Sequence, residues 1–215
     1  MNVEYINYKD RNNLVDAINS LEAIYRKELM KERSLYHEDL YLMSAIYKSI
    51  KLIDSFLYAL GSNNVTVLAI LTRVQIDCAL RTFGCAISNN STEYAKKGLS
   101  GSLEPRKEFD KNKNKLTDKY LCQELEKIFD YPIYDLYQKT SSAIHLTSLS
   151  FQNIAKAEND LNISMFISRN NREEDIETFT RLSNELGSQF VFFGKVLIYY
   201  IFDSWIEQKN NENLD

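Results

Sequence analysis

The scarcity of glycine and proline restricts the fold of this chain more than any other feature. There are only 6 Gly and 2 Pro among 215 residues, whereas an average usage of about 12% would give roughly 26. β-Sandwiches and β-barrels need many tight turns, and those turns depend on these two residues. The glycines also form neither of the glycine-rich motifs that cradle phosphates. The composition therefore predicts an all-α fold, a helical bundle of about six helices in a single domain over 1–215.

The charge and the cysteines exclude several functional classes. The net charge is −4, so no overall positive field draws the chain to nucleic acid or to an anionic membrane. Cys78, Cys85 and Cys122 have no metal-ligand spacing, and we expect neither a metal nor a cofactor. The first residues do not resemble a signal peptide, and two charges interrupt the most apolar stretch, 189–206. We therefore expect a cytoplasmic protein with reduced thiols and no membrane span.

Apolar residues that recur every three or four positions predict the first helices. The first helix is expected over about 10–31, and the second ends near Leu60, before the turn residues Gly-Ser-Asn-Asn at 61–64. The third, over about 65–88, is apolar on nearly every side. Such a helix is buried among its neighbours, so we expect it at the centre of the bundle.

The second half of the chain is less uniform. Residues 89–116 are polar and rich in lysine, which predicts a loop. Helices are expected again over about 117–129 and 132–150. Strict alternation of apolar residues predicts one short strand or hairpin near 161–168. A last long helix is expected to end near Glu207.

Charged residues on the third helix are the least expected feature of the sequence. Arg73, Asp77 and Arg81 recur every four residues and share one stripe, on which Gly84 also falls. Because buried charges are costly unless paired, one interpretation is an Arg–Asp–Arg ladder that satisfies itself. The other is that the two guanidiniums bind a phosphate or carboxylate. Gly84 would then give a ligand or a neighbouring backbone room to approach.

A second polar stripe lies on the helix expected over 132–150. Steps of four align Tyr137, Ser141 and His145. A Ser–His hydrogen bond would make this stripe structural, whereas a free imidazole would make His145 a general acid or base. Ser141 or Ser142 as a nucleophile is a weaker hypothesis, since no G-x-S-x-G motif surrounds them. His37, next to two acidic residues, is expected at the surface.

The expected loop is basic. Between Lys96 and Lys119 there are eight basic and four acidic residues. With Tyr94 and Phe109 available for stacking, this segment could contact a nucleic acid. The alternative is a solvated loop without a ligand.

Three motifs together resemble a group of uncharacterised bacterial helical proteins that are similar to the HEPN superfamily. They read T-R-V-Q-I-D-C-A-L-R (72–81), L-T-D-K-Y-L (116–121) and Y-x-x-x-S-S-A-I-H (137–145). The resemblance spans about residues 36–150. It implies a helical bundle related to proteins that cleave RNA without a metal through an Arg-x(4–6)-His motif. Those proteins often act across a homodimer interface, in toxin–antitoxin and antiphage systems.

The resemblance places His145 at the motif histidine. Lys139, six residues earlier, stands where the family has arginine. A lysine keeps the positive charge but lacks the guanidinium group, which can donate two parallel hydrogen bonds to a phosphate. In our first hypothesis a bacterial homodimer acts on RNA or a nucleotide, with His145 as general base toward a 2′-hydroxyl. Arg73, Arg81 or Lys139 would stabilise the developing phosphate charge. In the second, the protein is a non-catalytic homo-oligomeric interaction module whose stripe is structural, and in a third the same arginines sense a small anion.

Overall fold

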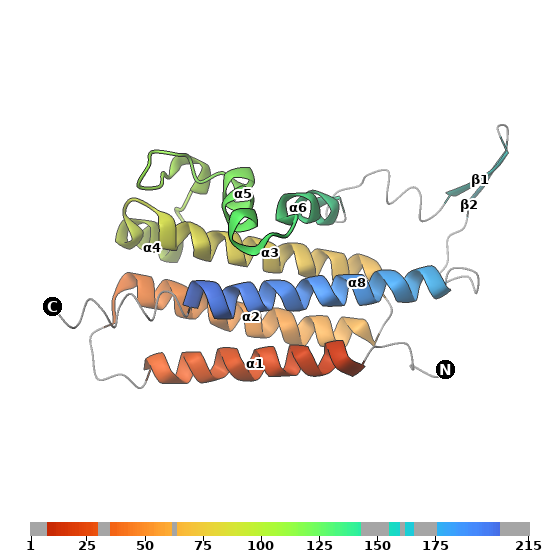
Figure 1. Cartoon of the computed structure of the whole chain (residues 1–215), viewed down its shortest axis with the longest axis horizontal. Helices are drawn as coiled ribbons and strands as arrows, with labels where there is room; N and C mark the ends of the chain where they lie inside the picture. The colour runs from red at the N-terminus through yellow and green to blue at the C-terminus, as the bar shows by residue number, and fades with distance from the viewer. Residues whose placement is uncertain are drawn as a thin grey trace.

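In the computed structural model, four long helices form the body of the protein. The structure describes residues 8–29, 35–61, 64–142, 155–159, 162–165 and 176–202. The long helices are α1 (Tyr8–Leu29), α2 (His37–Leu60), α3 (Val65–Ile87) and α8 (Ile176–Lys195), and α8 continues as the π-helical stretch η3 (Val196–Phe202). They lie along the long axis of the molecule, and the successive helices α1, α2 and α3 run antiparallel to one another (Figure 1). The prediction of an all-α helical bundle is confirmed.

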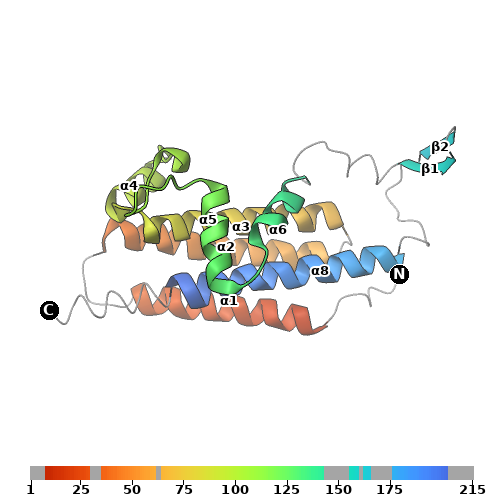
Figure 2. The same cartoon turned by 45° about the horizontal axis from the view of Figure 1, so that its top comes forward.

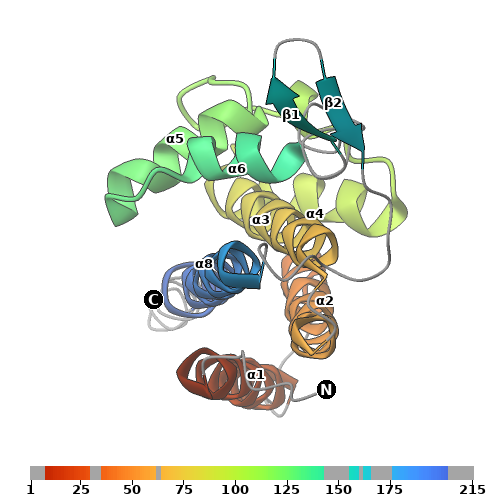
Figure 3. The same ribbon diagram turned by 90° about the vertical axis from the view of Figure 1, so that its right-hand side faces the viewer.

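The four helices form a ring in which each contacts two others. α2 packs between α1 and α3, and α8 closes the ring by packing against α3 and α1, as the view along the bundle shows (Figure 3). α3 also contacts α4, α5 and α6, which lie outside the ring. It therefore has neighbours on both sides, as its all-round apolar sequence predicts.

Apolar side chains fill the interior of the ring. Phe56 of α2 stacks on Phe190 of α8 with the ring centroids 4.2 Å apart. Leu14 and Leu21 of α1 and Ile76 of α3 are fully buried. Each such side chain stabilises the fold by about 1.5–3 kcal/mol relative to exposure, so hydrophobic burial holds the four-helix ring together.

A second layer covers the outer side of α3. It consists of α4 (Ser91–Ser100), the short 3₁₀ helix η1 (Pro105–Lys107), α5 (Asp118–Phe129) and α6 (Ile133–Ser141). α5 lies across α3 in two views of the molecule (Figures 1 and 2). This layer brings the third motif of the sequence against the first.

The prediction of a loop over 89–116 is wrong where α4 forms. The Asn90 side chain accepts a hydrogen bond from the backbone N–H of Glu93 at 3.0 Å and caps the helix. Gly101 ends it in the left-handed conformation, with φ at +75°. Tyr94 anchors the helix because its side chain is fully buried. The helix has too few apolar residues to show a clear hydrophobic periodicity, and its polar composition therefore resembles that of a loop.

The remainder of that segment folds around one carboxylate. Asp110 Oδ1 accepts hydrogen bonds from the backbone N–H groups of Asn112 at 2.9 Å and Asn114 at 2.7 Å. The Tyr120 hydroxyl donates to Asp110 Oδ2 at 2.5 Å. Burial acts to raise the pKa of Asp110, but these hydrogen bonds outweigh it and hold the pKa below its ordinary value. The Lys/Asn run is thus a defined turn.

A hairpin precedes the last helix. Strand β1 (Ala155–Asn159) pairs antiparallel with β2 (Asn162–Met165), with Ala157 opposite Ile163. The short strand or hairpin expected near 161–168 is confirmed for the residues of β2.

Two predicted helices are described only in part. The helix expected over 132–150 is α6 as far as Ser141, and residues 143–150, including His145, lie outside the described residues. The last helix is described to the end of η3.

Candidate functional site

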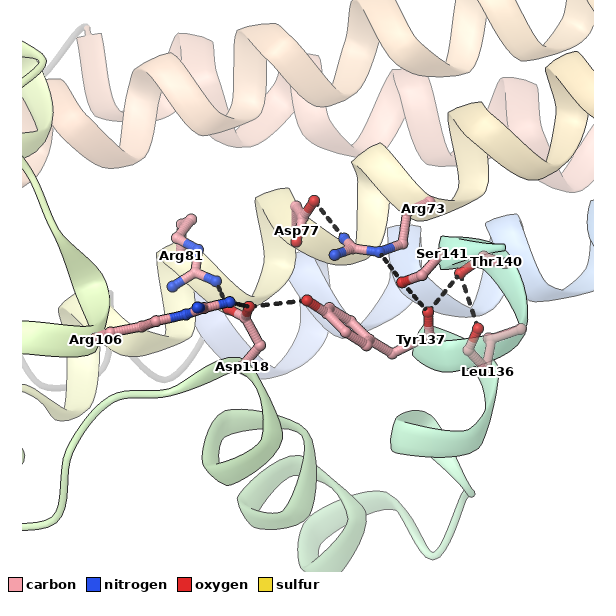
Figure 4. A network of polar contacts seen from close by, with 9 residues as sticks. All are labelled: Arg73, Asp77, Arg81, Arg106, Asp118, Leu136, Tyr137, Thr140 and Ser141. Atoms are coloured by element: carbon pink, nitrogen blue, oxygen red, sulfur yellow. Dashed lines mark hydrogen bonds and ion pairs between the residues drawn. The ribbon is translucent and has the colours of Figure 1, made fainter. Parts of the chain in front are cut away.

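The charged stripe of α3 faces α5 and α6 (Figure 4). Arg73 forms an ion pair with Asp77, one turn further along α3. Its Nε donates a hydrogen bond to Ser141 Oγ of α6 at 2.9 Å, and its guanidinium carbon lies 3.8 Å from the centroid of the Tyr137 ring. Only 9% of the Arg73 side chain is exposed. Arg73 therefore joins α3 to α6 by a hydrogen bond and a cation–π contact.

Asp118 is the second centre of this network. It forms an ion pair with Arg81 of α3 and accepts a hydrogen bond from the Tyr137 hydroxyl at 2.8 Å. Arg106 Nη2 of η1 lies 3.6 Å from the same carboxylate. Asp118 follows the N-cap residue Thr117 in the first turn of α5, where the helix dipole favours a negative charge. One carboxylate thus connects α3, η1, α5 and α6.

The network carries more positive than negative charge. It contains three guanidiniums and two carboxylates: Arg73, Arg81, Arg106, Asp77 and Asp118. The Arg81 side chain is 23% exposed and that of Arg106 is 79% exposed. Arg106 is accordingly the guanidinium of the network that a ligand reaches most easily, and an anion would balance its charge.

The space beside Gly84 is occupied by a neighbouring side chain. A Cβ added at Gly84 would lie 2.9 Å from the Tyr94 hydroxyl oxygen and 3.5 Å from Leu121 Cδ1. Burial raises the pKa of Tyr94 to about 12, although the charge of Arg81 acts in the opposite direction. In this structure, therefore, the missing side chain of Gly84 admits Tyr94 of α4.

The two serines of α6 are engaged by their own helix. Ser141 Oγ donates to the carbonyl of Tyr137 at 2.6 Å, and Ser142 Oγ donates to the carbonyl of Lys139 at 2.5 Å. Hydroxyl protons held by backbone carbonyls do not make activated nucleophiles. The alignment of Ser141 with His145 remains a prediction, since His145 lies outside the described residues.

Lys139 lies on the other side of α6. It stands two positions from both Tyr137 and Ser141, which corresponds to about 200° around the helix. Its exposed ammonium group forms an ion pair with Asp135 at 2.7 Å, and the hydrogen bond to Asp135 raises the pKa of Lys139. The structure therefore brings Tyr137 and Ser141 to Arg73 but directs Lys139 away from it.

The cysteines do not offer a reactive thiolate. Burial raises the pKa of Cys85 and of Cys122 to about 12, and it also raises the pKa of Cys78. No group of three or more His, Cys, Asp or Glu side chains that could hold a metal ion occurs among the described residues. Within the same part of the chain, every helix is too short or too polar to cross a membrane.

The sequence did not place three residues beside the charged stripe of α3. Asp118 lies in the L-T-D-K-Y-L motif, and its position after Thr117 indicates a helix start but no partner. Tyr94 and Arg106 belong to the segment predicted as a loop, and the prediction that Tyr94 is available for stacking is wrong because its side chain is fully buried. The cap residues Asn90 and Gly101 indicate a helix around Tyr94, whereas Arg106 lies outside that helix in η1.

Comparisons of the chain with protein-family models, with curated proteins and with solved structures gave no match.

Proposed function

We propose that this protein is a HEPN-like helical bundle that acts on RNA or on a nucleotide where α3 meets α6. The hydrogen bond between Arg73 and Ser141 supports this proposal most directly. It connects the first and third motifs of the resemblance, across 68 residues of sequence. Ser141 stands four residues before His145, so the arginine stripe meets the helix that leads to the motif histidine.

In the proposed reaction, His145 is the general base. It accepts the proton of a 2′-hydroxyl, and that oxygen attacks the adjacent phosphorus. The bond from phosphorus to the 5′-oxygen breaks, and this oxygen takes up a proton from a general acid or from water. The products are a 2′,3′-cyclic phosphate and a 5′-hydroxyl. Cationic side chains stabilise the charge that develops on the phosphate.

The arginines have different parts in this proposal. Arg106 is the exposed guanidinium of the network and contacts the phosphate. Arg73 is a positioning residue, because its side chain is nearly buried and holds Ser141, which stands four residues before the motif histidine in the sequence. Arg81 holds Asp118 and with it the start of α5.

The chain contains only two histidines, which provides a matched control. Purified His145→Ala and His37→Ala are each incubated with a labelled single-stranded RNA and a metal chelator. Loss of a general base costs about 10²- to 10⁴-fold in rate, so we expect His145→Ala to lose cleavage and His37→Ala to keep it. Fragments ending in a 2′,3′-cyclic phosphate are the expected product. Intact RNA with the wild type, or undiminished cleavage by His145→Ala, would overturn the nuclease proposal.

The ion pairs of the stripe favour a second candidate, a non-catalytic interaction module. Arg73 and Arg81 already have the carboxylates of Asp77 and Asp118 as partners, so neither needs a ligand to be satisfied. For this candidate the wild type neither cleaves nor binds an RNA oligonucleotide. Fluorescence anisotropy tests this candidate, because binding of RNA that Arg106→Ala abolishes would contradict it.

We further propose, from the resemblance, that the protein works as a homodimer in the bacterial cytoplasm, in a defence or toxin–antitoxin system. Induced expression of the wild type in a bacterium should then arrest growth, and His145→Ala should not. Equal growth of both strains at equal protein levels would contradict this role.

A further inference from the structure

An exposed aromatic ring lies on a short β-ribbon between η1 and α5. Phe109 and Lys115 stand opposite each other there as an antiparallel bridge. On either side of this pair, backbone hydrogen bonds of 3.0 and 2.9 Å join the two strands of the ribbon. In such a non-hydrogen-bonded pair the two side chains share one face, with their Cβ atoms about 5 Å apart. The ribbon therefore presents a ring and a lysine side by side, and we call residues 108–116 the Phe109 hairpin.

Contacts with α3 and α5 fix the Phe109 hairpin. The backbone N–H of Asn89, just after α3, donates to the Phe109 carbonyl at 2.9 Å, and the Tyr120 hydroxyl of α5 donates to the Asp110 carboxylate. Because successive side chains of a strand point to opposite faces, Asp110 turns inward and is 6% exposed, whereas Phe109 turns outward and is 38% exposed. The segment between α4 and α5 lies on the far side of α3 from α1 (Figures 1 and 3). The ring is thus accessible on a backbone that is already ordered.

The Phe109 hairpin also carries three lysines without acidic partners. Lys111, Lys113 and Lys115 are exposed, and none of them has an ion-pair partner among the residues that the structure describes. The carboxylates closest in sequence are engaged by other groups, and these are Glu104, Glu108, Asp110 and Asp118. On a chain with a net charge of −4, three uncompensated positive charges on one turn favour the binding of an anion there.

The backbone of Lys113 supports a functional interpretation of this turn. Its φ is +65°, in the left-handed region. Glycine adopts this conformation without a steric penalty, and asparagine adopts it more easily than lysine does. Strained backbone of this kind is concentrated at functional positions. The turn therefore carries a positive charge at a position where a smaller residue would fit the backbone better.

We propose that the Phe109 hairpin binds a single-stranded nucleic acid, with one base stacked on the Phe109 ring and the adjacent phosphates on its three lysines. A strand that alternates flat bases with charged phosphates matches an aromatic ring surrounded by cations. A duplex is the poorer ligand, because its base faces are hidden in the stack. An anionic membrane is also a poorer ligand, since the tip reads Lys-Asn-Lys at 111–113 and has no apolar side chain to insert.

This inference deepens the proposed function and rests on it for the identity of the strand as RNA. Arg106 precedes Phe109 by three residues, a span of at most about 11 Å of chain, so one strand can contact both. Arg106 in turn lies beside Asp118 in the network of α3, α5 and α6. Stacking and phosphate contacts do not distinguish RNA from DNA. A DNA strand should therefore bind the hairpin and compete with RNA, although it lacks the 2′-hydroxyl that the proposed reaction needs.

Fluorescence anisotropy tests the stacking contact with the full chain. The probe is a labelled RNA strand of about 12 nucleotides without self-complementarity, a length within the usual site size, and the His145→Ala variant keeps it intact. Phe109→Leu retains an apolar side chain but removes the aromatic face, so it should raise the Kd at least about fivefold. Phe109→Tyr keeps the ring and should bind as the unsubstituted protein does. Undiminished binding by Phe109→Leu would overturn the inference, and so would a duplex of the same sequence that binds as tightly as the strand.

Lys113→Gly tests the charge, because glycine adopts the backbone conformation of this position readily. The loss of one phosphate contact should flatten the slope of log affinity against log salt concentration by about 0.7. Lys51→Ala, at an exposed lysine of α2, is the matched control and should leave the slope unchanged. An equal slope for Lys113→Gly and the unsubstituted protein would contradict the phosphate contact.

Cosedimentation with vesicles of phosphatidylcholine and phosphatidylserine in equal parts tests the membrane alternative. We expect the protein to stay in the supernatant while it binds the RNA strand. Vesicles that carry the protein down and lose it in Phe109→Leu, with the RNA strand left unbound, would assign the hairpin to a membrane and overturn the inference.

Failure of the Phe109 hairpin can be distinguished from failure of the proposed function. RNA cleavage that Phe109→Leu and Lys113→Gly leave undiminished removes the hairpin and keeps the nuclease proposal. Binding of the strand that both variants weaken, in a protein that does not cleave RNA, keeps the hairpin and removes the nuclease proposal.

Discussion

The two sides of α3 are held by different forces. Toward α2, the polar contacts are neutral: Gln75 Nε2 donates to Ser49 Oγ at 3.3 Å, and Ser49 Oγ lies 3.6 Å from Cys78 Sγ. Toward α5 and α6, the polar contacts involve charged groups: Arg81 forms an ion pair with Asp118, and Arg73 donates a hydrogen bond to Ser141. The ring of long helices depends on apolar burial, whereas the outer layer also depends on charge.

This difference has consequences for stability and for function. Hydrophobic burial has no preferred direction and depends little on pH. A partly buried ion pair fixes the position of its partners, and the loss of one partner leaves the other with an uncompensated buried charge. The outer layer, where the candidate site lies, should therefore respond to changes that leave the four-helix ring intact.

The largest effect is expected inside the ring. Phe56→Ala removes a fully buried ring that stacks on Phe190 and should lower the free energy of unfolding by about 3–5 kcal/mol. Tyr58→Ala, two residues further on the same helix and 88% exposed, should change it by less than about 0.5 kcal/mol. Urea unfolding at low protein concentration measures both. Similar losses for the two variants would contradict the assignment of the core.

The next effect concerns the charged side of α3. Arg81→Met leaves Asp118 without its α3 partner, and Asp118→Leu leaves Arg81 without its carboxylate. Each should lower the free energy of unfolding by about 2–3 kcal/mol, and the double variant should lose less than the sum. Losses that simply add in a double-mutant cycle would show that this pair does not hold the layer.

Two glycines should respond with opposite signs. At Gly84 a new Cβ would lie 2.9 Å from the Tyr94 hydroxyl oxygen, whereas at Gly187 the nearest atom, Phe56 Cε1, is 4.0 Å away. We expect Gly84→Ala to destabilise the protein by about 1 kcal/mol or more. Gly187→Ala should stabilise it by about 0.5–1 kcal/mol, because alanine favours the helix. Tyr94→Phe should restore part of the loss at Gly84, and stabilisation by Gly84→Ala alone would refute the contact.

The smallest effect is on how the free energy of unfolding depends on pH through Asp110 of the outer layer. The folded pKa of Asp110 lies below its ordinary value, which is about 3.9 for an unfolded chain. The ionised carboxylate therefore contributes stability above about pH 4, and this contribution is lost as the pH falls through the lower folded value. The free-energy difference between wild type and Asp110→Asn should shrink on acidification. A difference that stays constant across this range would contradict the hydrogen bonds to Asp110.

Periodicity revealed the long helices but not the details of the outer layer. The apolar surface of the third helix predicted its central position, because burial on all sides leaves a direct trace in composition. α4 left no such trace, since one buried tyrosine and its neighbour suffice to anchor it. Short helices depend on caps and on tertiary contacts, which a sequence period does not record.

The candidate site was predictable only within each element. Steps of four placed Arg73, Asp77 and Arg81 on one stripe of α3, and Tyr137 with Ser141 on one stripe of α6. The meeting of the two stripes depends on how α5 and α6 cross α3. Asp118, which joins them, became visible only in three dimensions.

The contact between Arg73 and Ser141 is the most direct test of the proposed site. The rate of RNA cleavage should be measured for Arg73→Met, for Ser141→Ala and for the double variant, alongside their urea unfolding. If Arg73 acts by holding Ser141, each single variant should lose roughly tenfold in rate, and the double variant should be no slower than the worse single one. Independent losses that multiply, or cleavage that neither variant changes, would contradict the claim that this contact unites the two motifs.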